Sequence, residues 1–195
     1  MSIKILGFAG STRSESFNKR IVKIALAGAA KKGAETTFLD LKSLQMPLYD
    51  GDLEASSGLP ETARTFRDAL IAADGIIIAS PEYNGAPSAV LKNAIDWSTR
   101  PDPESPHQPS LVAWKGKVAA MMSCSPGRLG GLRGLSHLRL ILSGIGTLVL
   151  PTQVTVSAIH EELHEEGHLI DQKLHDQVEA LGAELLRVTN AVRSE

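Results

Sequence analysis

Residues 10–18, with the sequence GSTRSESFN, combine short polar side chains with one arginine. Ser11, Ser16 and Asn18 supply hydrogen-bond donors. The guanidinium of Arg13 is a planar fork that matches phosphate oxygens. An apolar run precedes the segment and a helical pattern follows it, so the N–H groups of a helix N-terminus would point at the same place. These residues predict a phosphate-binding loop, although the same serines would equally suit helix capping, and the sequence leaves both interpretations open.

Named phosphate motifs narrow the expected ligand. The P-loop pattern G-x-x-x-x-G-K-[ST] does not occur, and only Gly7 and Gly10 match the dinucleotide fingerprint G-x-G-x-x-G. Asp40 stands at the end of the second expected strand, where an acidic partner of a ribose would lie. Because the fingerprint is incomplete, a phosphate monoester fits the first loop better than a dinucleotide does.

A second loop, residues 80–85 (SPEYNG), contains turn formers and one aromatic ring but no metal-ligand pair and no nucleophile. Its backbone groups could bond the polar edge of a planar heterocycle, and Tyr83 could cover part of the ring. The alternative is that Tyr83 packs on a neighbour and that Asn84-Gly85 is only a turn. A third loop, residues 123–131, carries small residues whose glycines let the backbone approach a ligand closely.

The elements that must position these loops follow from the apolar patterning. Short apolar runs predict strands at residues 3–9, 36–40, 75–79, 117–123 and 147–150, the last with a second option of continuing past Pro151 to Val156. Helical spacing predicts helices at residues 16–32, 61–73, 88–98 and 130–143, and a last one through Leu174 and Val192. Residues 43–59 and 101–110, rich in Gly, Pro and polar residues, are expected to be loops.

Strands that alternate with helices predict an α/β fold with a parallel sheet covered by helices on both faces. Five such units match a doubly wound, flavodoxin-like sheet with strand order 2-1-3-4-5. The loops after the first, third and fourth strands then lie at one sheet edge, beside the point where the strand order reverses. We therefore expect the three loops to hold a single ligand.

The bulk composition limits the classes of partner. The 195 residues suggest a single domain spanning residues 1–195, and a net charge of −2 gives no reason to expect nucleic acid. The single cysteine rules out an internal disulfide. Neither a signal-peptide layout nor an apolar run of membrane-spanning length occurs, so we expect a cytoplasmic protein without a membrane partner.

Three segments, in the same order and spacing, carry a family resemblance: the first loop, the second loop, and Leu91-Lys-Asn-Ala-Ile-Asp-Trp97. Together they resemble the NADPH-dependent FMN reductase family, which includes bacterial quinone, chromate and azo-dye reductases. The resemblance implies a flavodoxin-like fold, bound FMN, hydride supply from NADPH or NADH, and a homodimer or homotetramer.

The resemblance also implies a set of cofactor-binding residues. The FMN phosphate and ribityl chain would contact Ser11, Arg13, Ser16, Phe17 and Asn18. The isoalloxazine ring would be lined by Pro81, Glu82, Tyr83, Asn84 and Gly85. A looser match in the third loop adds Ser123, Ser125 and Gly127. Because the flavin performs the redox chemistry, no catalytic side chain is expected.

Two other function classes compete with the reductase interpretation. An electron-carrying flavodoxin would normally be strongly acidic, with aromatic rings on both sides of the flavin. A flavin-free regulatory domain of similar topology would bind no FMN at all. The nearly neutral charge and the single Tyr83 favour an open ring face that receives hydride and serves a small-molecule acceptor, such as a quinone, free flavin, azo compound or chromate.

Several residues outside the loops invite a chemical interpretation. Residues 160–164 spell H-E-x-x-H, but the segment is polar and contains Gly167, so we expect a solvated connection and no metal site. Cys124 lies near the ligand edge by position and could be a redox thiol, but a free cysteine is usually a small buried packing residue. His137 is expected to be a packing or interface residue rather than a catalytic one. Trp97 and Trp114 suit either a subunit contact or the core.

Overall fold

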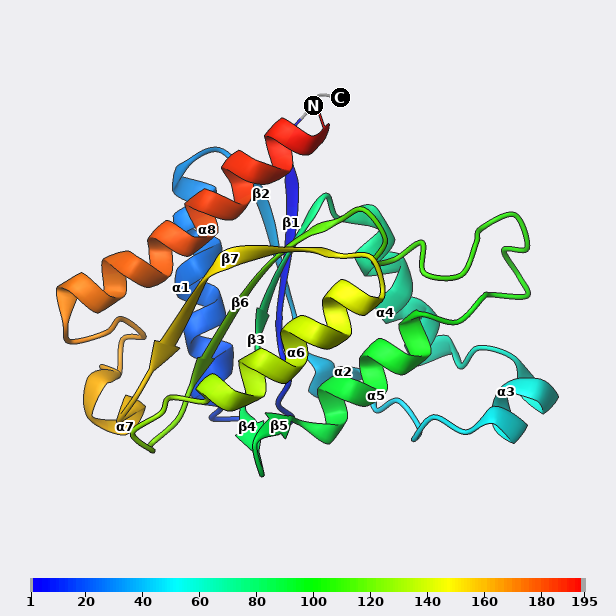
Figure 1. Cartoon of the computed structure of the whole chain (residues 1–195), viewed down its shortest axis with the longest axis horizontal. Coiled ribbons are helices and arrows are strands. Elements are labelled where there is room, and N and C mark those ends of the chain that lie inside the picture. The colour runs from blue at the N-terminus through cyan, green and yellow to red at the C-terminus, as the bar shows by residue number, and fades with distance from the viewer. Residues whose placement is uncertain (1, 194–195) are drawn as a thin grey trace.

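The computed structural model describes residues 2–193 and contains a five-stranded parallel sheet with the order β2-β1-β3-β6-β7 (Figure 1). Counted along the main sheet alone, this order is the expected 2-1-3-4-5, so the flavodoxin-like prediction is confirmed. The five strands are β1 (Lys4–Ala9), β2 (Glu35–Leu39), β3 (Gly75–Ala79), β6 (Val118–Cys124) and β7 (Leu148–Val156). Strand β7 follows the longer of the two options, because an edge strand tolerates Pro151.

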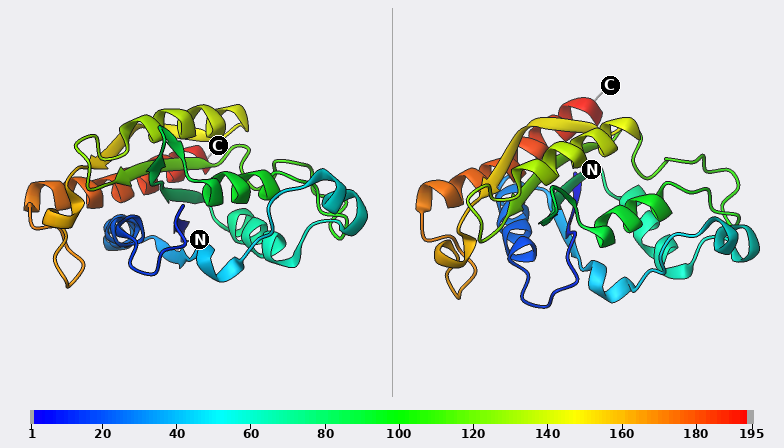
Figure 2. Two further views of the ribbon diagram at one scale, coloured as in Figure 1. Left: turned by 90° about the horizontal axis from the view of Figure 1, so that it is seen from below. Right: turned by 60° about the horizontal axis from the view of Figure 1, so that its bottom comes forward.

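Helices cover both faces of this sheet, as expected (Figures 1 and 2). One apolar cluster joins the sheet to α1 (Phe17–Lys31) and α8 (Gln172–Arg193). A second cluster, on the opposite face, joins it to α4 (Glu61–Ala72), α5 (Ala89–Ser98) and α6 (Leu132–Gly144). None of the helices within residues 2–193 combines the length and the apolar character that a membrane span requires.

The prediction of a plain loop at residues 43–59 is wrong in part. Helix α2 (Leu41–Leu44) enters this segment, and α3 (Gly51–Ser57) lies inside it. Each helix begins after an aspartate whose carboxylate accepts a backbone N–H: Asp40 from Lys42 at 2.9 Å and Asp50 from Asp52 at 2.8 Å. These local caps stabilise helices too short to show an apolar repeat.

Both tryptophans belong to the core. Trp97 and Trp114 are fully buried, and each indole N–H has a partner: Pro47 carbonyl at 2.8 Å and Ser98 hydroxyl at 2.9 Å, respectively. Of the two interpretations, a subunit contact is therefore wrong and a core position is confirmed.

Helices α1 and α8 approach each other through two reciprocal glycines. A Cβ on Gly28 of α1 would overlap the backbone carbonyl of Glu179 on α8. A Cβ on Gly182 of α8 would overlap the backbone carbonyl of Ala25 on α1. The absence of two side chains thus sets the distance between the helices. Helix α1 begins at the end of the first loop, so this packing also positions that loop.

A buried carboxylate fixes the loop at residues 101–110. Asp102 is 2% exposed and accepts hydrogen bonds from Arg64 Nε at 2.8 Å and Nη2 at 3.2 Å. These bonds hold the pKa of Asp102 below its ordinary value, although burial opposes them. Arg64 also pairs with Glu104 at 2.9 Å, but the Glu104 side chain is 71% exposed.

Asp102→Asn is expected to lower the free energy of unfolding at neutral pH by about 1.5–3 kcal/mol, because it removes charge-assisted hydrogen bonds. A lowered folded-state pKa stabilises the protein above the unfolded-state pKa, and this stabilisation disappears as pH falls through the folded-state value. The difference between parent and variant should therefore shrink in acid, as measured by urea unfolding at several pH values. Glu104→Gln is the matched control, with an expected loss of about 0–1 kcal/mol.

Candidate functional site

The three loops meet at the carboxyl edge of the sheet, at the lower side of Figure 1. Gly10 N–H donates to the Ala79 carbonyl at 2.9 Å, and Ser88 Oγ donates to the Gly10 carbonyl at 2.6 Å. Ser80 N–H donates to the Met122 carbonyl at 3.0 Å, which joins the second loop to β6. The predicted convergence of the loops is thus a property of the backbone network.

The first loop contains hydrogen-bond donors that bind no protein group within the described residues. Ser16 is the N-cap of α1, yet its side chain makes no capping hydrogen bond. Within the described residues, the Arg13 guanidinium is exposed and makes no ion pair, whereas nearby Arg20 pairs with Glu15 at 2.7 Å. Ser11 is 5% exposed, and its Oγ accepts the Arg13 N–H at a long 3.4 Å. A helix N-terminus with a spare hydroxyl and an unpaired arginine fits a phosphate group.

Asn18 has a different environment from the rest of the first loop. Its side chain is buried, Nδ2 donates to the Cys124 carbonyl at 3.1 Å, and Oδ1 accepts the Cys124 N–H at 3.2 Å. The amide therefore ties α1 to the end of β6 and positions the first loop against the third. Phe17 beside it is partly buried against the core cluster that includes α1 and α8.

The second loop is a short β-hairpin that the sequence interpretation did not include. Strands β4 (Glu82–Tyr83) and β5 (Ala86–Pro87) are antiparallel, and the two residues between them have positive φ, 54° at Asn84 and 80° at Gly85. Positive φ at both central residues is the requirement of a type I′ turn, for which Asn-Gly is the strongest signal. Tyr83 is 55% exposed at the tip.

Helix α6 holds this hairpin in place. The Glu82 carboxylate pairs with Arg133 at 2.6 Å and accepts the Gly134 N–H at 3.0 Å. Burial would raise the pKa of Glu82, but hydrogen bonds from Gly134 and Arg133 outweigh it and hold the pKa below its ordinary value. His137 Nδ1 lies 2.7 Å from the Gly85 carbonyl, so this nitrogen carries the proton.

The third loop contains an orphaned polar group. Ser123 is fully buried, and its hydroxyl has no hydrogen-bond partner among the described residues. A Cβ on Gly131, whose φ is 89°, would overlap this hydroxyl, so glycine is required there. Ser125 and Gly127 form a local turn, in which the Gly127 N–H donates to the Ser125 hydroxyl at 3.2 Å.

Cys124 is not a reactive thiol. The residue is 2% exposed, and burial raises the pKa of its thiol. A protonated buried thiol is a poor nucleophile. The expectation that Cys124 is a packing residue is confirmed.

The NADPH-dependent FMN reductase family model matches residues 3–161, which include all three loops. The chain belongs to this family. It is 36% identical over 179 residues to an NAD(P)H-dependent FMN reductase of Pseudomonas aeruginosa, covering 91% of this chain and 90% of that protein. It is also 36% identical to a 2-hydroxy-1,4-benzoquinone reductase of a Burkholderia species, covering 88% of each chain.

A solved structure extends the FMN reductase likeness to three dimensions. A flavoenzyme NAD(P)H:(acceptor) oxidoreductase from Paracoccus denitrificans superposes with a TM-score of 0.77 at 26% identity, over 97% of this chain and 98% of that one. The protein is therefore an NAD(P)H-dependent oxidoreductase with FMN as its cofactor. The donors at the N-terminus of α1 fit the phosphate of that cofactor.

The structure brings the expected site residues to one sheet edge but gives them different tasks. Ser11, Arg13, Ser16, Tyr83 and the Asn84-Gly85 turn lie in the converging loops, whereas the polar groups of Asn18 and Glu82 bind protein atoms. Pro81, which immediately precedes the hairpin, is buried. The sequence interpretation missed Ser88, which bonds to the first loop, and Arg133 and His137, which fix the hairpin to α6. These contacts could only be recognised from the fold.

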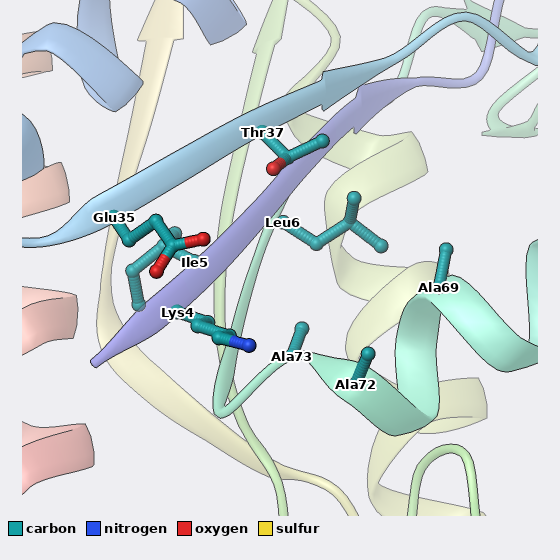
Figure 3. A pocket seen from close by; sticks show the side chains of 8 residues that line it. All are labelled: Lys4, Ile5, Leu6, Glu35, Thr37, Ala69, Ala72 and Ala73. Atoms are coloured by element: carbon teal, nitrogen blue, oxygen red, sulfur yellow. The ribbon is translucent and has the colours of Figure 1, made fainter. Parts of the chain in front are cut away.

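A hollow at the other end of the sheet offers no comparable chemistry. It measures about 240 Å³ and lies between the amino ends of β1 and β2 and the last turn of α4 (Figure 3). Apolar Leu6 and the alanines Ala69 and Ala72 of α4 line it, and the charged side chains of Lys4 and Glu35 border it. We assign no ligand to it.

Proposed function

We propose that the protein transfers reducing equivalents from NAD(P)H through bound FMN to a small-molecule acceptor of the quinone class. The observation that supports the proposal is the convergence of a polar loop, in which Ser16 makes no capping hydrogen bond, and an exposed Asn-Gly hairpin at one edge of a flavodoxin-like sheet. FMN, when bound, supplies the hydride and two-electron chemistry. The protein supplies the binding and the orientation.

In this proposal the first loop holds the phosphate end of the cofactor. Arg13 neutralises phosphate charge, and the Ser11 and Ser16 hydroxyls and the N-terminus of α1 donate hydrogen bonds. The third loop contributes Ser125 and Gly127 beside them. Ser123 begins the third loop, and its buried hydroxyl has no hydrogen-bond partner among residues 2–193.

The hairpin holds the ring end. Its backbone from Pro81 to Gly85 borders the flat part of the cofactor, and the Glu82 ion pair and the His137 contact prevent the turn from shifting. Tyr83 is the one aromatic side chain of the hairpin, and it is more exposed than buried. One open ring face would serve NAD(P)H and the acceptor in turn.

Anaerobic mixing of the FMN-loaded protein with NADPH, and separately with NADH, tests the proposal. A rapid two-electron loss of flavin absorbance, reversed by added benzoquinone, is the expected result. Direct reduction by neither nucleotide would indicate an electron carrier instead. A protein that takes up no added FMN would contradict the cofactor assignment.

Arg13→Ala is expected to weaken FMN binding by about 1.5–3 kcal/mol, because it removes a charge-assisted contact to phosphate. Arg20→Ala, which removes an arginine of the same helix end that is already paired with Glu15, is the matched control and should weaken binding far less. Fluorescence titration of the apo-proteins with FMN measures both. Equal losses of FMN affinity in the two variants would show that Arg13 contributes only its positive charge and makes no direct contact with the phosphate.

We further propose a homodimer or homotetramer located in the cytoplasm. Leu129, Leu132, Leu140 and Leu148, on α6, the loop before it and β7, are 43–72% exposed, and large exposed apolar side chains favour a subunit contact. The single cysteine suits a reducing compartment. Light scattering on protein eluting from a size-exclusion column measures the molar mass and tests this oligomeric state. A monomer at micromolar concentration would contradict it.

A further inference from the structure

The H-E-x-x-H segment does not form the helical zinc site that its letters suggest. Helix α7 (Ile159–Glu162) ends before the second histidine, and Leu163 is extended and bridged to Leu169. His160 and His164 therefore do not share a helical face, which the motif requires. The prediction that this segment is a polar connection is confirmed.

The chain forms a small hairpin instead. His164 N–H donates to the His168 carbonyl at 2.9 Å, and Gly167, with φ of 91°, donates its N–H to the His164 carbonyl at 2.9 Å. Leu169, which is 1% exposed, anchors one arm in the core cluster, and Leu163 packs against the same cluster. The hairpin is thus a built structure in which His164 and His168 stand opposite each other.

The side chains at the end of this hairpin form a compact ligand set. The imidazoles of His164 and His168 stack with ring centroids 4.5 Å apart and an interplanar angle of 20°. Glu166 Oε2 lies 4.0 Å from His168 Nδ1, and one ligand atom from each of the three residues lies within 4.8 Å of the others. All three residues are exposed, so an ion can reach them without opening the fold.

We propose that this hairpin binds one Zn²⁺ ion through His164, Glu166 and His168. Two imidazoles and one carboxylate are ligands that zinc accepts, whereas Mg²⁺ and Ca²⁺ favour oxygen ligands. Ligands of a tetrahedral zinc ion lie roughly 3.3 Å apart, given bonds of about 2.0–2.1 Å, so small side-chain rotations suffice. The long 3.3 Å hydrogen bond from Glu166 N–H to His164 Nδ1 is lost when the metal binds either ring nitrogen.

Side chains of both charge signs surround the hairpin, and the acidic ones lie next to the proposed ligands in sequence. Glu161, Glu162 and Glu165 add negative charge in the same short segment. On the other side, Arg20 and Lys23 line a hollow of about 500 Å³ that the hairpin shares with α1 and α8. The remaining histidine there, His175, is already engaged, because its Nδ1 accepts the Leu169 N–H and its Nε2 lies 3.5 Å from Glu179.

Zinc at this position would connect the two arms of the hairpin. Three protein ligands leave a fourth coordination position for water or for an exogenous ligand. Binding to the folded protein alone would raise its stability by mass action. The site is independent of the redox proposal, since none of its ligands belongs to the three loops.

Titration of untagged, FMN-loaded protein with ZnCl₂, followed by isothermal calorimetry, tests the proposal. A stoichiometry of one is expected, and Co²⁺ in place of Zn²⁺ should give the visible absorption of a site with nitrogen ligands. His168→Gln and Glu166→Gln should each weaken zinc binding at least about tenfold. His160→Gln is the matched control, because this residue belongs to the H-E-x-x-H letters but not to the hairpin set.

The variants distinguish the hairpin site from a helical H-E-x-x-H site. Retained binding in His160→Gln together with lost binding in His168→Gln supports the hairpin site. The reverse pattern, or the absence of one saturable site in the parent protein, overturns it. Because all the exchanged side chains are exposed, circular dichroism and FMN retention should be unchanged in every variant.

Discussion

Gly182→Ala is expected to lower the free energy of unfolding by about 3 kcal/mol, at the upper end of the usual cost of overpacking. The added methyl would overlap the backbone carbonyl of Ala25, and no side-chain rotation can relieve a contact with backbone. Helices α1 and α8 would have to separate, and the apolar contacts on both sides of the crossing would weaken. Urea unfolding measures the loss.

Gly144→Ala provides the matched control. Gly144 ends α6, and a Cβ there would meet no atom of the described residues within 4 Å. Alanine is favoured over glycine in a helix by roughly 0.5–1 kcal/mol, so this variant should be unchanged or slightly stabilised. A similar loss in both variants would show that the helix crossing is not the cause.

A double-mutant cycle with Gly28→Ala tests the crossing itself. Gly28 meets the Glu179 carbonyl in the reciprocal contact, so one separation of the helices relieves both overlaps. The combined loss should therefore be smaller than the sum of the two single losses. Additive losses of unfolding free energy would mean that the two overlaps are relieved independently and not by one separation of the helices.

Regular elements were predictable because each carries its own pattern. Strand β3, Gly75–Ala79, is apolar throughout and has the expected bounds, and α8 follows the spacing of its apolar residues. Helices α2 and α3 have no such repeat, since Asp40 and Asp50 stabilise them through local caps. A short helix that depends on one cap leaves little trace in a hydrophobic pattern.

The position of the site at the sheet edge was predictable, but the hydrogen bonds and ion pairs that hold it together were not. Strand order alone brings the loops after β1, β3 and β6 to one edge, and the Asn84-Gly85 pair was visible as a turn. The bonds from Ser88 to Gly10 and from Arg133 to Glu82 join residues far apart in the chain. No spacing rule relates such pairs, so they appear only when the sheet is assembled.

Asn18→Ala is the second large effect that we expect, at about 2–6 kcal/mol of unfolding free energy. The substitution leaves both the N–H and the carbonyl of Cys124 without their partner at a buried position, and each unsatisfied group costs about 1–3 kcal/mol. The loss should be present in protein stripped of FMN, measured by urea unfolding. A variant that loses only FMN affinity would show that Asn18 binds the cofactor and does not position the loops.

Asn18→Asp distinguishes the two halves of this contact. The introduced carboxylate can still accept the Cys124 N–H, but it would face the Cys124 carbonyl, which offers no proton. Burial and this repulsion raise the carboxyl pKa in the folded state, so the folded variant binds a proton more tightly than the unfolded chain does. Its stability relative to the parent should therefore recover as pH falls through the raised pKa, where the protonated group can again donate. Asn18→Ala has no group to titrate, so its loss relative to the parent should not recover in this way, and a recovery confined to the Asp variant would identify the Nδ2 bond to Cys124 as the contact that joins the first loop to the third.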